Sequence, residues 1–144
     1  MHHLETQIDA SVERVWSLLV DFPAYPRWNP FVRSIEGILE VGQTLKVFIQ
    51  PPGTKGMYFQ PTVLSVHPNY ELRWKGKLFL PGLFDGEHCF KLEEKPEGGL
   101  IFHQSETFSG ILVPLFRRSL DGSTKQGFAA MNEALKREAE TPDA

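Results

Sequence analysis

The chain has 144 residues, of which 41% are hydrophobic and 23% charged, as is usual for one globular domain (residues 1–144) with a sizeable core. The net charge of −3 gives no support for binding to nucleic acid, and no apolar run approaches the ~20 residues of a stable membrane insertion. A single cysteine, Cys89, excludes an intramolecular disulfide, and since no secretory signal is visible we expect a cytoplasmic protein.

The first residues predict a strand followed by a short helix. Residues 3–9 alternate between apolar and polar side chains, which is typical of a half-buried strand. Ser11 can then cap a helix of about 10 residues, because the apolar residues after it are spaced for one helix face. These residues are Val12, Val15, Trp16 and Leu19.

The ten residues 21–30 are the most informative stretch of the chain. Three prolines within it prevent a regular continuation of the helix. Yet Phe22, Tyr25 and Trp28 supply more aromatic surface than a solvated loop carries. We expect this stretch to fold back onto the body with a second short helical turn, or to cover the mouth of an enclosed apolar space.

Six further segments have the composition of strands and are separated by residues typical of turns. Their ranges are 31–38, 43–50, 56–67, 70–77, 86–94 and 99–109. From Pro114 to about Glu140 the pattern is helical, and Gly127 could admit a close neighbour or leave room for a ligand. This order predicts an α+β fold, in which a curved antiparallel sheet of seven strands wraps around a long C-terminal helix, with two short helices after the first strand.

Three motifs, spread over nearly the whole chain, carry a resemblance to a known family. They are Ile8-Asp9-Ala10 running into Val15-Trp16, Asp21-Phe22 through Tyr25 to Trp28-Asn29-Pro30, and Glu106-Thr107-Phe108-Ser109-Gly110. With the order of the elements, they resemble the helix-grip superfamily of START domains and birch-pollen-allergen-like proteins. Within it, the chain is similar to the polyketide cyclase/dehydrase and lipid-transport group (SRPBCC). The resemblance implies a shared cavity between sheet and helix, not a shared reaction.

The last two predicted strands combine aromatic and polar side chains on one face. Alternation gives each strand a Phe-rich face that is the better candidate for the interior. In the strand 86–94 this face holds His88, Phe90 and Leu92, and in the strand 99–109 it holds Phe102, Gln104, Glu106 and Phe108. With a turn centred on Glu97, His88 faces Glu106, whereas a register moved by two places His88 opposite Gln104. We expect the residues of these faces other than Leu92 to contact a ligand.

Glu106 needs a partner if its face is buried, since burying an unpaired carboxylate costs several kcal/mol. We expect it to bond to His88, to an amide side chain, or to backbone donors near Trp28 and Asn29. His88 and Glu106 would then be a satisfied buried pair, an anchor for the polar head of a ligand, or a general acid/base pair.

Further candidates for the cavity wall lie outside this hairpin. Trp28 and Asn29 either line the entrance or serve as a core plug and a turn cap. Trp74 is on a face where core packing is expected, and it is also a candidate for ligand contact. Phe79 belongs to the apolar loop 78–84, which could act as a mobile lid or as a static plug.

Several chemistries lack their sequence signatures. The chain has no glycine-rich phosphate loop, no paired cysteines and no nucleophile elbow. The five histidines are scattered, and His2 and His3 could be native or the remnant of a tag. We therefore expect no metal site and no cofactor.

The sequence thus favours a binding module for a hydrophobic small molecule of lipid, polyketide or isoprenoid type. The alternative is a cofactor-free cyclase or dehydratase that uses His88 and Glu106, as the resemblance allows. A third hypothesis is a co-chaperone-like interaction domain, which would need a large exposed apolar patch. The oligomeric state is left open.

Overall fold

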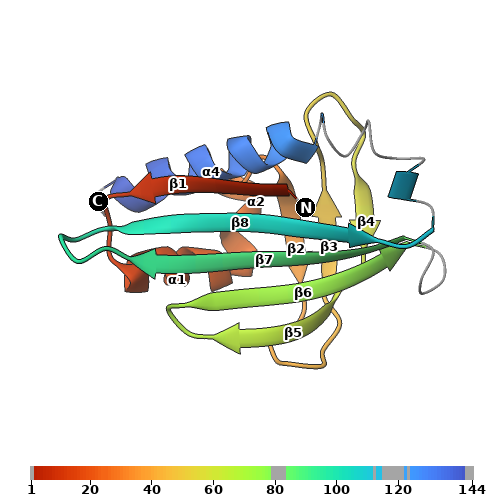
Figure 1. Ribbon diagram of the computed structural model, residues 1–144, viewed down its shortest axis with the longest axis horizontal. Coiled ribbons are helices and arrows are strands. Elements are labelled where there is room, and N and C mark those ends of the chain that lie inside the picture. Colours follow the sequence, from red (N-terminus) through yellow and green to blue (C-terminus); the bar gives the residue numbers. More distant parts are fainter. Residues whose placement is uncertain (1, 79–83, 112, 115–121, 123, 142–144) are drawn as a thin grey trace.

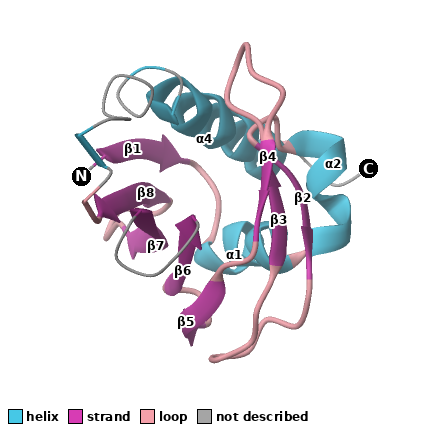
Figure 2. Cartoon of the chain, turned by 90° about the vertical axis from the view of Figure 1, so that its right-hand side faces the viewer, coloured by secondary structure: helices cyan, strands magenta, loops and turns pink. Residues whose placement is uncertain are grey.

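The strands form two antiparallel sheets (Figures 1 and 2) in the computed structural model, which describes residues 2–78, 84–111, 113–114, 122 and 124–141. The strands are β1 (His2–Ile8), β2 (Val32–Glu36), β3 (Lys46–Ile49), β4 (Met57–Phe59), β5 (Thr62–His67), β6 (Glu71–Leu78), β7 (Phe84–Glu94) and β8 (Leu100–Ser109). One sheet has five strands in the order β1-β8-β7-β6-β5, and the other has three in the order β2-β3-β4. The α+β fold with antiparallel sheets is as predicted.

The prediction of a single seven-stranded sheet is wrong, because the segment 56–67 breaks into β4 and β5, which belong to different sheets. Pro61 lies at the break, where it supplies no N–H for a ladder and restricts the backbone of Gln60. The Pro61 carbonyl accepts a hydrogen bond of 2.9 Å from the Leu45 N–H, which holds this corner against the segment before β3. The chain therefore passes from one sheet to the other at Pro61.

The described part of the chain contains the helices α1 (Val12–Val20), α2 (Tyr25–Trp28) and α4 (Lys125–Glu140), and the 3-10 turn η1 (Phe22–Ala24). Two short α-helices thus follow the first strand, as predicted. The Ser11 hydroxyl accepts a 3.1 Å bond from the Arg14 N–H, which confirms the expected cap of α1. None of the helices in the described residues is long and apolar enough to cross a membrane.

The stretch 21–30 folds back onto the body. Phe22, Tyr25 and Trp28 are all buried, and the Tyr25 hydroxyl donates a 2.6 Å hydrogen bond to the Leu19 carbonyl. Burial, with a smaller contribution from the charge of Asp21, raises the pKa of the Tyr25 phenol well above its ordinary value. The aromatic side chains of this stretch are therefore part of the core.

The long helix α4 packs along β1, and Figure 2 shows it between that edge strand and the three-stranded sheet. Its buried face includes Phe128, Met131 and Leu135, the spacing that the sequence indicated. A Cβ at Gly127 would lie 2.3 Å from Cδ1 of Phe31, so this glycine admits a close neighbour. The helix was predicted from Pro114, but residues 115–121 lie outside the described part of the chain.

Candidate functional site

A cavity of about 390 Å³ lies between the two sheets. The three-stranded sheet lines it with apolar side chains from β3 and β4, and the five-stranded sheet contributes residues from β6, β7 and β8. Its volume falls within the range of about 300–1,000 Å³ that is usual for small-molecule sites. The cavity was expected between the sheet and the last helix, but in the structure most of its wall comes from the two sheets.

Two glycines leave space in this wall. Gly76 of β6 and Gly86 of β7 are directly paired, and both border the cavity. A Cβ at Gly86 would lie only 2.8 Å from Oε1 of Glu106. Gly86 therefore leaves room for the carboxylate, and a side chain there would displace it.

His88 and Glu106 face each other across β7 and β8, in the register predicted from a turn centred on Glu97. His88 Nδ1 lies 2.6 Å from Glu106 Oε2. The His88 side chain is 2% exposed and that of Glu106 is 14% exposed, so the pair is largely removed from solvent. Both residues border the cavity, and the prediction that Glu106 has a hydrogen-bond partner is confirmed.

A chain of hydrogen bonds continues behind His88 into the core. His88 Nε2 lies 3.0 Å from Gln104 Oε1, and Gln104 Nε2 donates a 2.6 Å bond to Asn132 Oδ1. Asn132 Nδ2 then donates to the backbone carbonyl of Leu4 at 3.4 Å and to the Thr6 hydroxyl at 3.1 Å. Gln104 and Asn132 are fully buried, so these contacts satisfy groups that water cannot reach.

The backbone carbonyl of Leu4, at the end of this series of hydrogen bonds, determines which group donates and which accepts in each of them. A carbonyl can only accept, so Asn132 directs its amide nitrogen toward Leu4 and its oxygen toward Gln104. Gln104 must then direct its own oxygen toward His88, and His88 Nε2 must carry a proton to donate to it. The tautomer of the imidazole at Nε2 is therefore determined by a group on β1.

One further proton lies between His88 Nδ1 and Glu106 Oε2. Two bare acceptors would repel each other at 2.6 Å, so either the imidazole or the carboxyl group is protonated there. The indole of Trp74 stacks on the imidazole, with centroids 5.6 Å apart and planes at 23°. The pair therefore presents an acid–base group at the wall of a mostly apolar cavity.

Seven of the predicted site residues either border the cavity or lie directly behind its wall. Trp74, His88, Glu106 and Phe108 border the cavity. Behind this wall, Gln104 bonds to His88, and Phe90 and Phe102 are buried with their rings stacked at 5.8 Å. Phe79 and residues 79–83 of the predicted loop lie outside the described residues.

Trp28 and Asn29 have structural positions in this fold. Asn29 Oδ1 accepts hydrogen bonds of 2.9 Å from the N–H groups of Phe31 and Val32, so it caps the turn that leads into β2. Trp28 is buried against Tyr25, with ring centroids 5.2 Å apart. Neither residue borders the cavity. Of the two interpretations open from the sequence, Trp28 therefore fits that of a core plug and Asn29 that of a turn cap.

Sequence reasoning missed the apolar half of the wall and the far end of the hydrogen-bond chain. The missed wall residues include Phe31, Val47, Ile49, Met57, Phe59 and Pro61. Asn132 was also missed, although it stands among apolar residues on the buried face of α4. A polar residue in an apolar stripe was the available signal, because buried amides need partners.

The family model described as polyketide cyclase / dehydrase and lipid transport matches residues 1–140. No curated protein matched the sequence.

Among solved structures, protein MLL2253 from Mesorhizobium loti is 24% identical, with a TM-score of 0.73 over 99% of this chain and 98% of that one. The Zhui aromatase/cyclase from Streptomyces sp. R1128 is 17% identical, with a TM-score of 0.74 over 96% of this chain and 93% of that one. The di-domain ARO/CYC BexL from the BE-7585A biosynthetic pathway is 16% identical, with a TM-score of 0.77 over 99% of this chain and 50% of that one. These similarities show a shared fold. Because the family model spans nearly the whole sequence, the chain belongs to the polyketide cyclase / dehydrase and lipid transport family.

Proposed function

We propose that the protein binds a compact hydrophobic small molecule of lipid, polyketide or isoprenoid type in the cavity between its sheets. The observation that carries this proposal is the His88–Glu106 pair in the wall of a mostly apolar cavity of about 390 Å³. Apolar side chains would contact the body of the ligand, and the pair would orient its polar group. Membership of the family supports the same class of ligand.

Glu106 offers the atom for this orientation. Its Oε2 is engaged by His88, whereas Oε1 lies on the side of Gly86, which has no side chain of its own to occupy the space beside it. A ligand hydroxyl can donate to Oε1. We therefore expect a preference for apolar molecules that carry a phenolic, enolic or alcoholic hydroxyl over the same skeletons without one.

Paired probes test this proposal. Tag-free protein is titrated with 1-naphthol and with naphthalene, and binding is followed by fluorescence. The wild type should prefer 1-naphthol by about tenfold or more, since a hydrogen bond to a charged group contributes about 1.5–3 kcal/mol. Glu106→Gln should reduce this preference. Native mass spectrometry and solvent extraction of the purified protein should reveal any retained apolar compound.

A cavity-filling variant locates the binding. Ile49→Trp adds bulk to the wall, whereas Leu64→Trp adds the same indole at an exposed position of β5 that does not border the cavity. Binding of 1-naphthol should be lost in Ile49→Trp and retained in Leu64→Trp. Equal binding by both variants would show that the probe binds elsewhere.

A second function, cofactor-free cyclisation or dehydration, is favoured by the proton held between His88 and Glu106. A pair that shares one proton at 2.6 Å can give a proton to a bound polyketide or take one from it. Single-turnover assays with a polyketide substrate test this role. If His88→Ala and Glu106→Gln both leave the rate unchanged, the pair is not catalytic.

A further inference from the structure

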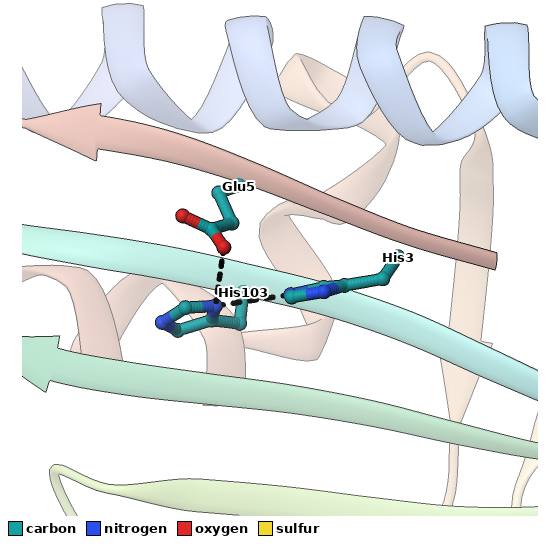
Figure 3. A group of neighbouring side chains, drawn as sticks. All are labelled: His3, Glu5 and His103. Atoms are coloured by element: carbon teal, nitrogen blue, oxygen red, sulfur yellow. Dashed lines mark hydrogen bonds and ion pairs between the residues drawn. The ribbon is translucent and has the colours of Figure 1, made fainter. Parts of the chain in front are cut away.

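Three potential metal ligands meet on the face of the five-stranded sheet opposite the cavity. Figure 3 shows His3 and Glu5 of β1 beside His103 of β8. His103 alternates along β8 with Gln104 and Glu106, which point inward, so its side chain leaves the opposite side of the sheet. The cluster is therefore separate from the proposed ligand site.

The pairing of β1 with β8 creates this cluster from residues about 100 positions apart. Glu5 is directly opposite His103, and His3 is opposite Ser105, which makes it a diagonal neighbour of His103. Because His3 and Glu5 are two residues apart on one strand, both point to the same face. The strand register alone thus gathers two imidazoles and a carboxylate.

The distances within the cluster suit a small cation. His3 Nε2 lies 3.0 Å from His103 Nδ1, and Glu5 Oε1 lies 4.0 Å from the same Nδ1. All three ligand atoms lie within 4.8 Å of one another. Bonds of about 2.0–2.2 Å in tetrahedral geometry would place ligand atoms about 3.4 Å apart. The observed distances lie on either side of that value, so small side-chain rotations would suffice.

A carboxylate outside the cluster orients His103. His103 Nε2 lies 2.8 Å from Glu93 Oε1, and an ionised carboxylate only accepts, so this nitrogen carries the proton. Nδ1 then presents its lone pair toward His3 and Glu5. Metal-bound histidines commonly donate their second N–H to a carboxylate in this way.

The lysine that is paired with His103 does not place its ammonium group in the cluster. Lys91 pairs with His103 across β7 and β8, but its ammonium lies over the ring of Tyr70, 5.2 Å from the centroid. Cys89, the one thiol of the chain, is opposite Ser105 and is not among the three grouped ligands.

We propose that His3, Glu5 and His103 form a binding site for a divalent transition-metal cation of the Zn²⁺ class, with Glu93 as the residue that orients His103. Two imidazoles and a carboxylate are a ligand set that suits Zn²⁺ and leaves a fourth position for water or for a ligand from another molecule. The site goes beyond the proposed function and does not depend on it.

Calorimetric titration of tag-free protein with ZnCl₂, supported by equilibrium dialysis, tests the site. The wild type should bind one equivalent. His103→Ala should abolish this binding, and Glu93→Gln should weaken it by about tenfold or more, as is usual when an orienting partner is lost. Circular dichroism of each variant checks that it is folded.

Two matched variants make the test specific. His67→Ala removes another exposed histidine of the same sheet, and Cys89→Ser removes the thiol; both should bind Zn²⁺ like the wild type. No saturable binding by the wild type, equal binding by His103→Ala, or loss of binding in Cys89→Ser would overturn the proposal.

Discussion

The contact between Gly127 and Phe31 allows a quantitative test of how α4 meets the wall of the cavity. An alanine Cβ at position 127 would lie 2.3 Å and 2.4 Å from two carbons of the Phe31 ring, well inside the 3.0 Å below which Cβ contacts are essentially never observed. The ring cannot move freely, because it is 2% exposed and packs edge-on against Phe128 at 5.7 Å. Gly127→Ala must therefore displace either the ring or the helix.

The magnitude follows from two opposing effects. Alanine is favoured over glycine within a helix by up to about 1 kcal/mol, whereas overpacking of a core costs about 1–3 kcal/mol. Because a separation of 2.3 Å calls for the upper part of the overpacking range, we expect Gly127→Ala to lower the free energy of unfolding by about 1–2 kcal/mol. In the background of Phe31→Leu the clash is relieved, so the same change should raise the free energy of unfolding by up to about 1 kcal/mol.

Urea unfolding, followed by tryptophan fluorescence, measures all four proteins of this double-mutant cycle. The decisive result is a change of sign between the two backgrounds. If Gly127→Ala is as stable as the wild type, or has the same effect in both backgrounds, the packing described for α4 is wrong. Because Phe31 borders the cavity, binding of 1-naphthol should also weaken in Gly127→Ala.

Three further predictions concern the hydrogen-bond chain, acid stability and the thiol. Asn132→Leu leaves the Gln104 amide buried without its acceptor, so urea unfolding should show a loss of about 1–3 kcal/mol in the free energy of unfolding. The affinity for 1-naphthol should change as well; an unchanged affinity would contradict the inference that these hydrogen bonds orient His88. The Asp9 N–H donates to the Glu140 carboxylate at 2.8 Å and holds the pKa of this group below its ordinary 4.5. The ionised carboxylate therefore stabilises the folded protein above pH 4.5, and this stabilisation is lost as the pH falls through the lower pKa of the folded state. Glu140→Gln should therefore lose less stability than the wild type between neutral and acid pH in urea titrations, and equal losses would refute this. Burial raises the pKa of Cys89, so its reaction with a disulfide reagent at pH 8 should be slower in the native than in the urea-unfolded protein, and equal rates would show an exposed thiolate.

Local patterns predicted the hairpin of β7 and β8 well. A turn at a known position, together with side chains that alternate between two faces, is sufficient to define a register. With a turn centred on Glu97 these patterns paired His88 with Glu106, as observed, although a register moved by two was also open. The buried face of the last helix followed in the same way from its 3.6-residue period.

Features that depend on distant pairings were not visible from the sequence. The cluster of His3 and His103 exists only because β1 pairs with β8, and neither strand carries a signal for its partner. The separation of β4 from β5 did have a signal, since proline is rare inside strands, and Pro61 should have divided the segment 56–67. The second sheet and the apolar half of the wall were missed with it.

The two sheets carry different parts of the proposed recognition. Val47 and Ile49 of the smaller sheet shape the space, whereas His88 and Glu106 of the larger sheet supply the polar contact, and Asn132 orients this pair from behind through Gln104. Substitutions on β3 and β4 could alter which skeleton is accepted without disturbing the acid–base pair. Ligand choice and proton chemistry can therefore diverge independently among proteins with this arrangement, and an engineer could redesign either one while leaving the other intact.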